Sequence, residues 1–319
     1  MKILITGVAG FIGFSFSKHL LMQKKYKIFG VDNLNNCYDP KLKKERLKIL
    51  KKYKNFKFKK IDICINKKVE SIFKLNKFDF IFHFAAQAGV RYSIDYPRKY
   101  IDANINGFFN IIENSKKFNV RRLFYASSSS VYGENKNYPL NEKEKILPKN
   151  MYALSKKINE EISFIYNNYY KLKLTGLRFF TVYGEWGRPD MMMLRFISSF
   201  YNNKTFKLFN YGNHQRDFTY IGDVVKIMEL LLKNHKKLNE NDVYNICSNN
   251  PINLIKIINF MKKNGINPKI KKISLQKADI LKTHGDNKKI LNITNHKNFL
   301  KWQEGIKKTI SWYRNFAIK

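Results

Sequence analysis

The segment that most restricts the possible folds stands at the start of the chain. A short run rich in apolar residues, KILIT (residues 2–6), is followed by glycines at positions 7, 10 and 13 and then by residues with helical spacing. Gly7 allows a tight turn, Gly10 lets a diphosphate approach the backbone, and Gly13 lets the helix pack against the strand. The first turn of such a helix offers N–H groups and partial positive charge to phosphates. The pattern predicts a strand–turn–helix unit that binds a dinucleotide.

The chain up to about residue 180 alternates expected strands with expected helices. Strands are predicted at 27–32, 56–63, 78–86, 122–130 and 173–180, and helices at 39–53 and from about residue 152. This alternation indicates a parallel α/β sheet, and the continuous apolar segment FDFIFHFAA (78–86) is typical of a strand covered on both faces. DVYNIC (242–247) is expected to add a strand, and amphipathic helices are expected near 252–264 and 304–316.

These elements predict a Rossmann-like, doubly wound parallel sheet with a smaller C-terminal α/β lobe. We expect a dinucleotide-binding domain at 1–176 and a mainly substrate-binding lobe at 177–319, with the chain crossing back to the first domain. Asp32 ends the second strand, where a carboxylate binds both ribose hydroxyls and repels a 2′-phosphate, so NAD is favoured over NADP. Asp62 ends the third strand and is placed either near the adenine or as an ordinary loop carboxylate.

Tyr152 and Lys156 are four residues apart and therefore share one helix face. A free tyrosine has a pKa of about 10 and is a poor base at neutral pH. A nearby ammonium group and a positively charged nicotinamide ring both stabilise the phenolate, so we expect the pKa of Tyr152 to fall. The same lysine is expected to hold the nicotinamide ribose. The alternative is an unremarkable pair on a surface helix.

Four consecutive serines, residues 127–130, follow the apolar residues LFYA. Ligands of a doubly wound sheet lie beyond the carboxyl ends of its strands, which is where these hydroxyls are expected. A serine there is able to hydrogen-bond a reacting oxygen beside the tyrosine. The alternative is a capping or turn hydroxyl, which suits Ser130 better than it suits all four.

Six motifs follow one another along the chain: Gly7-x-x-Gly10-x-x-Gly13, HFAAQAGVRYS, SSSSVYG, Tyr152-x-x-x-Lys156, LRFFTVYG and RDFTYIGDV. Together they resemble the extended short-chain dehydrogenase/reductase family, in particular its NAD-dependent nucleotide-sugar epimerases. The resemblance runs nearly end to end and implies a catalytic set of Ser128, Tyr152 and Lys156. The NAD contacts that we carry over are Gly7, Gly10, Phe11, Ile12, Gly13, Asp32, Asn33, Asp62, Ile63, Ala85, Ala86, Tyr152, Lys156 and Phe179.

The two residues after Ser128 bear on the reaction. Related dehydratases and decarboxylases carry acidic residues there, whereas this chain has Ser129 and Ser130. A serine hydroxyl does not have a pKa suited to acid–base work. The resemblance therefore favours 4-epimerisation, in which Tyr152 moves the proton of the sugar 4-hydroxyl, over loss of water.

The segments AAQAGVRYSIDYP, NNCYDPKLKKERL and LRFFTVYGEWGRPDMM look most like UDP-glucuronate 4-epimerases. A 4-keto uronic acid loses CO₂ readily, so its carboxylate has to be held by donors and a cation. The substrate-binding residues that we expect are Arg91, Ser128, Ser129, Thr181, Arg188, Arg216, Gln276 and Asp279. Arg188 is able to fork onto a carboxylate; its alternatives are a salt bridge to Asp190 or a diphosphate contact.

Further alternatives stay open for the remaining members of that set. Arg91 is either a second cation for the substrate or a loop-stabilising arginine. Arg216 matches the family's diphosphate-binding arginine, and Gln276 and Asp279 match its segment near the uridine. Lys277 and Ala278 replace the usual Pro-Gly of that segment, and GEWG (184–187) replaces the usual Gly-Pro-Trp-Gly.

The formal net charge of +37, from 61 basic and 24 acidic residues, favours phosphate-bearing ligands. Because the lysines are scattered, AT-rich coding explains them better than a nucleic-acid footprint, and we expect no nucleic-acid partner. The three cysteines and isolated histidines indicate reduced thiols and no metal site. Neither a secretory pattern nor a membrane span is recognised, so a cytoplasmic protein is expected.

The resemblance also implies a homodimer formed through the Tyr152 helix and the helix before it. INEEISFIYNNYY (158–170) has the apolar stripe for such a bundle, including Ile158, Ile162 and Ile165. The leading hypothesis is a UDP-glucuronate 4-epimerase that makes UDP-galacturonate for surface polysaccharide. One alternative is an epimerase of UDP-GlcNAc or UDP-glucose. An alternative of another class is a non-catalytic nucleotide- or RNA-binding relative.

Overall fold

The computed structural model describes residues 1–276 and 279–317. Its strands are β1 (Lys2–Thr6), β2 (Lys27–Asp32), β3 (Phe56–Lys60), β4 (Phe80–His83), β5 (Arg122–Ser128), β6 (Leu174–Phe179), β7 (Thr181–Tyr183), β8 (Phe206–Phe209), β9 (Gln215–Tyr220), β10 (Asn241–Ile246), β11 (Pro251–Asn253) and β12 (Ile270–Ile273). Its α-helices are α1 (Phe11–Leu21), α2 (Pro40–Leu50), α3 (Asn66–Lys74), α4 (Tyr92–Asp95), α5 (Pro97–Tyr100), α6 (Gly107–Lys117), α7 (Met151–Tyr170), α8 (Met192–Tyr201), α9 (Ile221–Lys233), α10 (Leu254–Lys263), α11 (Lys288–Thr294) and α12 (Trp302–Ala317). Single turns are η2 (Ser129–Tyr132), η3 (Asn210–Gly212) and η4 (His235–Lys237), and η1 (Ile101–Asn106) is a π-helical segment that leads into α6.

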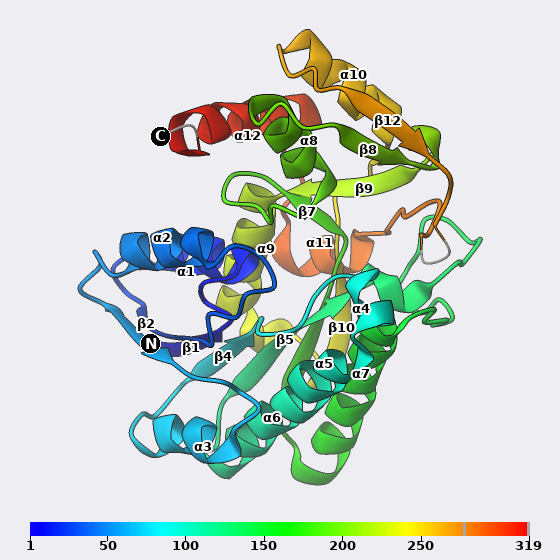
Figure 1. The fold of residues 1–319 in the computed structure, drawn as a ribbon. Helices are drawn as coiled ribbons and strands as arrows, with labels where there is room; N and C mark the ends of the chain where they lie inside the picture. Colours follow the sequence, from blue (N-terminus) through cyan, green and yellow to red (C-terminus); the bar gives the residue numbers. More distant parts are fainter. Residues whose placement is uncertain (277–278, 318–319) are drawn as a thin grey trace.

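A large sheet in the described part of the chain contains seven strands in the order β10-β6-β5-β4-β1-β2-β3, and every neighbouring pair is parallel (Figure 1). The chain adds β2 and β3 on one side of β1 and then continues with β4 on the other side. The strand order therefore reverses between β1 and β4, which is where doubly wound sheets bind their ligands. The predicted fold class is confirmed.

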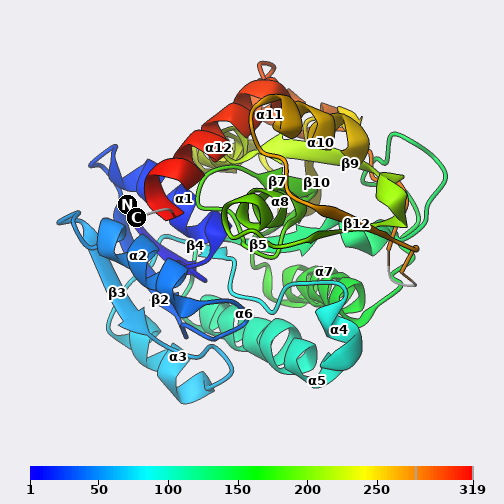
Figure 2. The same ribbon diagram turned by 45° about the horizontal axis from the view of Figure 1, so that its top comes forward.

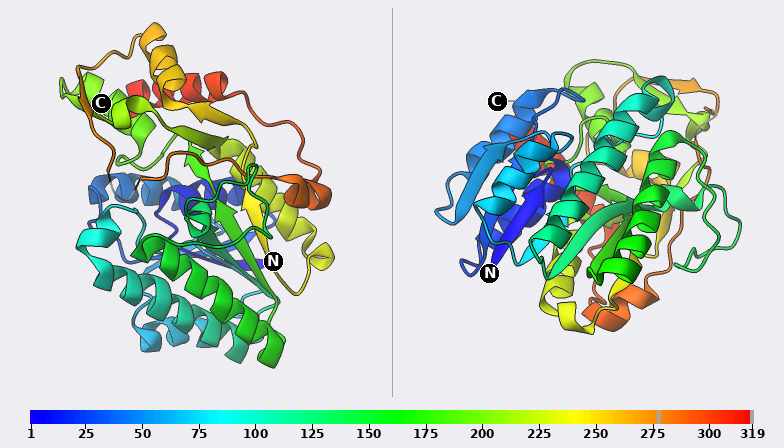
Figure 3. Two further views of the ribbon diagram at one scale, coloured as in Figure 1. Left: turned by 90° about the vertical axis from the view of Figure 1, so that its right-hand side faces the viewer. Right: turned by 90° about the horizontal axis from the view of Figure 1, so that it is seen from below.

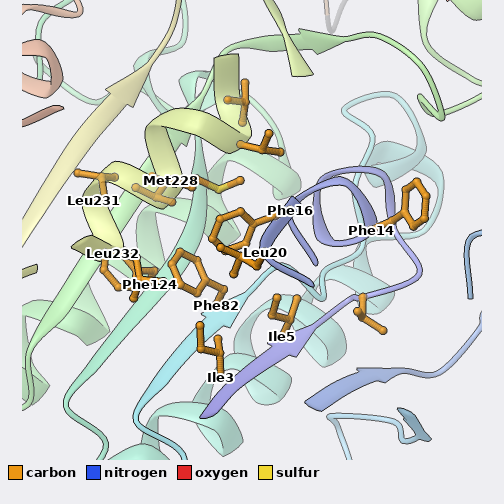
Figure 4. Close-up of a cluster of buried hydrophobic side chains, with 14 of the residues drawn as sticks. Ile3, Ile5, Phe14, Phe16, Leu20, Phe82, Phe124, Met228, Leu231 and Leu232 are labelled. Atoms are coloured by element: carbon orange, nitrogen blue, oxygen red, sulfur yellow. The ribbon is translucent and has the colours of Figure 1, made fainter. Parts of the chain in front are cut away.

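Helices cover both faces of this sheet, because successive side chains along its strands point to opposite faces and both faces are apolar. In β1, Ile3 and Ile5 join one cluster while Leu4, between them, joins the other. The first cluster packs under α1 and α9, where Phe16 and Leu20 meet Met228 (Figure 4). The second cluster packs under α3, α6 and α7. Strands that are buried on both faces explain why the sequence shows continuous apolar runs there.

A second lobe lies above the large sheet in Figure 1 and in the left view of Figure 3. It contains the strand sets β11-β9-β7 and β12-β8 with helices α8, α10 and α12, around a core that includes Phe196, Phe218 and Ile257. The C-terminal helix α12 lies on the same side as α1 and α2 (Figure 2). The boundary after residue 176 stays a prediction; β6 spans that position, and β10 returns to the large sheet beside β6.

Candidate active site

The glycine-rich turn between β1 and α1 is tightly enclosed. Gly7 has a φ of +67°, and a Cβ on it would lie 2.7 Å from the amide nitrogen of Ala85. A Cβ on Gly13 would lie 2.3 Å from the carbonyl oxygen of Gly7, so only glycine lets α1 approach the turn this closely. No side chain in the described residues caps α1, whose N-cap is Gly10. The helix start, with Phe11 and Ile12 in its first turn, thus offers N–H groups to an anionic ligand.

Two carboxylates follow the turn along the strand ends. Asp32, buried at the end of β2, accepts hydrogen bonds from the amides of Ala9 (3.1 Å) and Leu34 (2.8 Å). Asp62, after β3, accepts from the Asn33 side chain (3.2 Å) and the Cys64 amide (2.9 Å). Burial raises the pKa of Asp62, but those hydrogen bonds outweigh burial and leave the pKa below its usual value. Acceptors at these strand ends suit the ribose and adenine of NAD, and the glycine turn suits its diphosphate.

The other expected NAD contacts also stand at carboxyl ends of the sheet. Ile63 follows β3, Ala85 and Ala86 follow β4, and Phe179 ends β6 beside Ser128, which ends β5. The Ala85 amide donates to the Thr6 hydroxyl at 3.1 Å, which ties the segment after β4 to β1. The structure therefore gathers the predicted set along one edge of the sheet, on both sides of the switch point between β1 and β4.

Helix α7 brings Tyr152 and Lys156 to this edge. The helix begins after Asn150, whose side chain accepts a hydrogen bond from the Ala153 amide and so caps it. Lys156 is buried, and its Nζ donates to the Ala126 carbonyl at 2.7 Å. Burial lowers the pKa of Lys156 to about 8. The ammonium is thus held by the backbone of β5, two residues before Ser128.

The electrostatics of Tyr152 differ from the sequence-based expectation. Burial raises the pKa of the Tyr152 phenol, while the Ser128 hydroxyl and the positive charge of Arg188 act in the opposite direction. The Lys156 ammonium, expected to act on this phenol, donates to the Ala126 carbonyl. The cation that acts on the phenol is Arg188, whose own pKa is raised chiefly by Asp190 despite burial.

The four serines have three different environments. Ser127 points away from the strand end and donates to Glu160 at 2.6 Å, and Glu160 in turn pairs with the buried Arg178. Ser128 accepts a hydrogen bond from the Ser130 amide at 3.2 Å and caps the turn η2, which contains Ser129 and Ser130. The capping hydroxyl is therefore Ser128 and not Ser130, and the strand ends at Ser128.

Two of the three cations expected to bind substrate are already paired with carboxylates within the chain. Arg188, in the loop between β7 and α8, forms a two-pronged contact with Asp190 at 3.1 and 2.6 Å. Arg91, before α4, forks onto Asp279 at 2.8–3.1 Å and lies over the Phe209 ring. Both arrangements match alternatives that the sequence left open for these arginines, and both leave the guanidinium groups at the edge of the two lobes.

Arg216 and Gln276 lie on the second lobe near that pair. Arg216, in β9, donates to the carbonyls of Ile280 and Leu281, so it has backbone partners and keeps its charge available. Burial lowers the pKa of Arg216 to about 10. Gln276 contacts its own loop through the Ser274 carbonyl at 3.3 Å. Thr181 begins β7, directly after the strand that ends at Phe179. The replacement noted at Lys277 and Ala278 lies outside the described residues.

Two buried side chains near these groups were not anticipated from the sequence. His214, next to β9, is buried with its Nε2 3.9 Å from the Asp279 carboxylate. Arg46, in α2, is fully buried and donates to carbonyls of both lobes. Both belong to quoted or neighbouring motifs, but their contacts come from segments far away in the chain, which a single sequence does not reveal.

Comparison with known proteins adds to this geometry. The NAD dependent epimerase/dehydratase family matches residues 3–247, more than half of the chain. The protein belongs to this family. The UDP-glucuronate 4-epimerase of Thermodesulfobacterium geofontis is 39% identical over 313 residues, which cover 97% of this chain and 95% of that protein.

Solved structures of epimerases from this family superpose closely on the chain. UDP-glucuronic acid 4-epimerase from Bacillus cereus, in complex with UDP-glucuronic acid and NAD, has a TM-score of 0.91 and 27% identity, with 99% of both chains covered. UDP-glucose 4-epimerase from Thermotoga maritima, with UDP-glucose, has a TM-score of 0.88 and 28% identity, with 100% of both chains covered. The predicted epimerase activity, an isomerisation, and the predicted cofactor NAD are confirmed at the level of the family.

NAD, when bound, supplies a hydride acceptor and donor. The residues predicted to act beside it offer a phenol at Tyr152, a hydroxyl at Ser128 and an ammonium at Lys156. Their assignment as the catalytic set stays a prediction. Within the described residues, no group of three or more His, Cys, Asp or Glu side chains is placed to hold a metal ion. None of the described helices is long and apolar enough to cross a membrane.

Proposed function

We propose that the protein is a UDP-glucuronate 4-epimerase, which interconverts UDP-glucuronate and UDP-galacturonate at C4. The observation that carries this proposal is the position of Arg188, whose charge acts on the Tyr152 phenol and whose guanidinium is forked and already bound to a carboxylate, Asp190. A cation in this position suits the C6 carboxylate of a uronic acid whose 4-hydroxyl meets Tyr152. The identity of 39% to a UDP-glucuronate 4-epimerase supports the same substrate.

In this proposal Tyr152 takes the proton from the sugar 4-hydroxyl and later returns it from the other face of the sugar. Ser128 holds the same oxygen by a hydrogen bond. Lys156 would hold the nicotinamide ribose of NAD, and its ammonium would add positive charge beside the phenol. That charge offsets the burial that otherwise raises the pKa of Tyr152.

The substrate carboxylate needs restraint because an oxidised C4 makes the sugar a β-keto acid. Arg188 would exchange Asp190 for the substrate carboxylate, with Ser129 and Thr181 as hydroxyl donors. Holding the C5–C6 bond away from alignment with the C4 carbonyl prevents loss of CO₂. The absence of acidic side chains at Ser129 and Ser130 disfavours the acid–base steps of a dehydratase.

The uridine diphosphate is placed on the second lobe in this proposal. Arg216 is assigned to the diphosphate, because it donates to carbonyls and no carboxylate among the described residues forms a direct ion pair with it. The ion pair between Arg91 and Asp279 is placed next to the diphosphate in this proposal. Gln276 lies in the same loop as Asp279.

The deciding experiment incubates the purified protein separately with UDP-glucuronate, UDP-glucose and UDP-GlcNAc, with and without added NAD⁺. We expect UDP-galacturonate from the first and no 4-epimer from the other two. A pentose product would indicate decarboxylation and would contradict the role given to Arg188 and the serines. A 4-epimer of UDP-glucose or UDP-GlcNAc would favour the second candidate below.

The second candidate is a 4-epimerase of UDP-glucose or UDP-GlcNAc, favoured by the close superposition with the Thermotoga maritima enzyme. It predicts that Arg188→Ala leaves activity nearly unchanged. The non-catalytic alternative predicts salt-dependent retention of RNA and no turnover. The presence of Ser128, Tyr152 and Lys156 at one edge of the sheet argues against it.

The homodimer remains part of the proposal. Helices α6 and α7 lie side by side on the outside of the molecule (Figure 1, Figure 3). Their exposed apolar and aromatic side chains are Phe109, Leu154, Phe164, Ile165, Tyr169 and Tyr170. A second copy packing on this face would bury them. A cytoplasmic location and a role in making surface polysaccharide stay predictions.

A further inference from the structure

A buried arginine lies between the two loops that build the site. Arg46 is 0% exposed, and its guanidinium donates to the carbonyl of Ala9 (2.8 Å), the hydroxyl of Tyr38 (2.7 Å) and the carbonyls of Trp186 and Gly187. Within residues 1–276 and 279–317, no carboxylate forms an ion pair with it. Desolvation lowers the pKa of Arg46. Since well-packed apolar side chains often replace buried charges at no cost in stability, a role beyond stability is indicated.

The acceptors of Arg46 belong to two distant parts of the chain. Ala9 lies in the glycine turn between β1 and α1, whereas Trp186 and Gly187 directly precede Arg188. Trp186 has a φ of +60°, a left-handed conformation that is unfavourable for a tryptophan and persists only where its surroundings enforce it. Its indole packs against Phe14 of α1 and against Phe316 of α12.

Arg46 therefore orients the two peptide groups that lead into Arg188. A lysine does not reproduce this arrangement, because the planar guanidinium spans several acceptors that a single ammonium does not reach together. Arg46 and Arg188 are also close enough for their charges to repel. Two guanidinium groups that repel each other do not hold themselves together. Arg46 is instead connected to Arg188 through its hydrogen bonds to the Trp186 and Gly187 carbonyls, which directly precede Arg188.

We propose that Arg46 is a positioning residue, which clamps the Trp186–Gly187 loop to the cofactor turn and thereby sets where Arg188 stands relative to Tyr152. The effect of Arg46 on substrate choice rests on the proposed function, in which Arg188 binds the sugar carboxylate. The segment NNCYDPKLKKERL, to which Tyr38 and Arg46 belong, thus contributes to substrate choice through the position of Arg188.

The first test reads the loop directly. Hydrogen exchange of the full-length protein is compared for wild type, Arg46→Lys and Arg122→Met. Arg122 is a matched control, because it is buried and its guanidinium also donates to carbonyls, those of Leu238 and Asn239, far from the site. We expect about tenfold faster exchange of amides 184–190 in Arg46→Lys and no local change there in Arg122→Met. Unchanged exchange in Arg46→Lys would overturn the clamp.

The second test measures ligand binding by calorimetry in a Tyr152→Phe background loaded with NAD⁺, so that no turnover occurs. Arg46→Lys is expected to weaken UDP-glucuronate binding about tenfold and UDP-glucose binding less than about twofold. In the cycle with Arg188→Ala, the effect of Arg46→Lys should disappear, because both changes remove the same contact. Fully additive effects would contradict positioning through Arg188.

The two proposals fail in different ways. If Arg188→Ala does not change the preference for UDP-glucuronate over UDP-glucose, the carboxylate contact of the proposed function is wrong. The exchange of amides 184–190 then still decides whether Arg46 holds the loop.

Discussion

At the scale of single residues, the site combines groups whose positions were predictable with groups whose contacts were not. Gly7, Asp32 and Lys156 follow from spacing after strands and along a helix, because each needs only local structure to reach the sheet edge. Arg46 and His214 meet partners more than thirty residues away in the chain, so local sequence patterns do not predict these contacts. The partners of such side chains depend on how distant segments pack in the folded protein, and a single sequence does not reveal that packing.

The first prediction concerns the proton carrier. Tyr152→Phe removes the hydroxyl that accepts and returns the sugar proton, so kcat for epimerisation should fall by about 10²–10⁴-fold with a small change in KM. Tyr170→Phe, at the exposed end of the same helix, is the control and should keep wild-type kcat. Initial rates from separated UDP-sugars measure both. Undiminished turnover in Tyr152→Phe would remove the basis of the proposed mechanism.

The second prediction concerns how the buried ammonium of Lys156 lowers the free energy of unfolding. The folded protein holds Lys156 with a pKa of about 8, below its ordinary value of 10.5, because of burial. Between those values the unfolded chain binds more protons, so this group makes the free energy of unfolding rise with pH. Lys156→Met should therefore be more stable than wild type at pH 7, by about 1–3 kcal/mol.

Denaturant titrations at pH 7 and pH 9.5 measure this difference, which should shrink at the higher pH. A Lys156→Met variant that is less stable than wild type at pH 7 would show that the hydrogen bond to Ala126 outweighs the cost of burying the ammonium.

At the scale of elements, the sequence predicted the central strands and the helices α10 and α12 well, but not the short strands of the second lobe. β2 spans Lys27–Asp32 as expected, because a buried parallel strand is a continuous apolar run between turn signals. β4 and β5 are shorter than their apolar patterns, since Ala85 and Ser129 already belong to the loops that face the site. The short strands β7, β8, β9, β11 and β12 were not predicted. They have three to six residues and depend on pairing with distant partners.

The third prediction concerns the contact between α1 and α9, which stabilises the layer beneath the glycine turn. Glu229 of α9 is buried and accepts from His19 of α1 at 2.9 Å, with Lys226 and Lys233 nearby. Despite burial, these partners lower the pKa of Glu229 to about 2. Stability from this group is therefore complete above its unfolded pKa of 4.5 and is lost as pH falls through about 2.

Glu229→Gln should lower the free energy of unfolding by about 1–2 kcal/mol at pH 7, a value reduced for the exposed lysine partners. The deficit relative to wild type should be smaller at pH 3. Urea titrations at the two pH values provide the measurement, and Glu144→Gln, in a surface loop, is the control. An equal deficit at both pH values would assign the effect to packing instead of charge.

At the scale of the whole molecule, the exposed apolar face of α6 and α7 is where the proposed dimer would form. The fourth prediction is that Phe164→Glu with Tyr169→Glu converts a dimer to a monomer, because both side chains are more than half exposed on α7. Light scattering after size-exclusion chromatography gives the mass. Tyr211→Glu, equally exposed but on the second lobe, should leave the dimer intact. A monomeric wild type would disprove the dimer.

The strand β10 has a consequence for how the chain acquires its structure during synthesis. Residues 241–246 complete the edge of a sheet whose other strands lie before residue 180, so β6 waits for about sixty further residues to leave the ribosome. Until then its hydrogen-bonding groups stand open to any extended segment nearby. We therefore expect nascent chains stalled before residue 241 to aggregate more readily than chains that have passed residue 246.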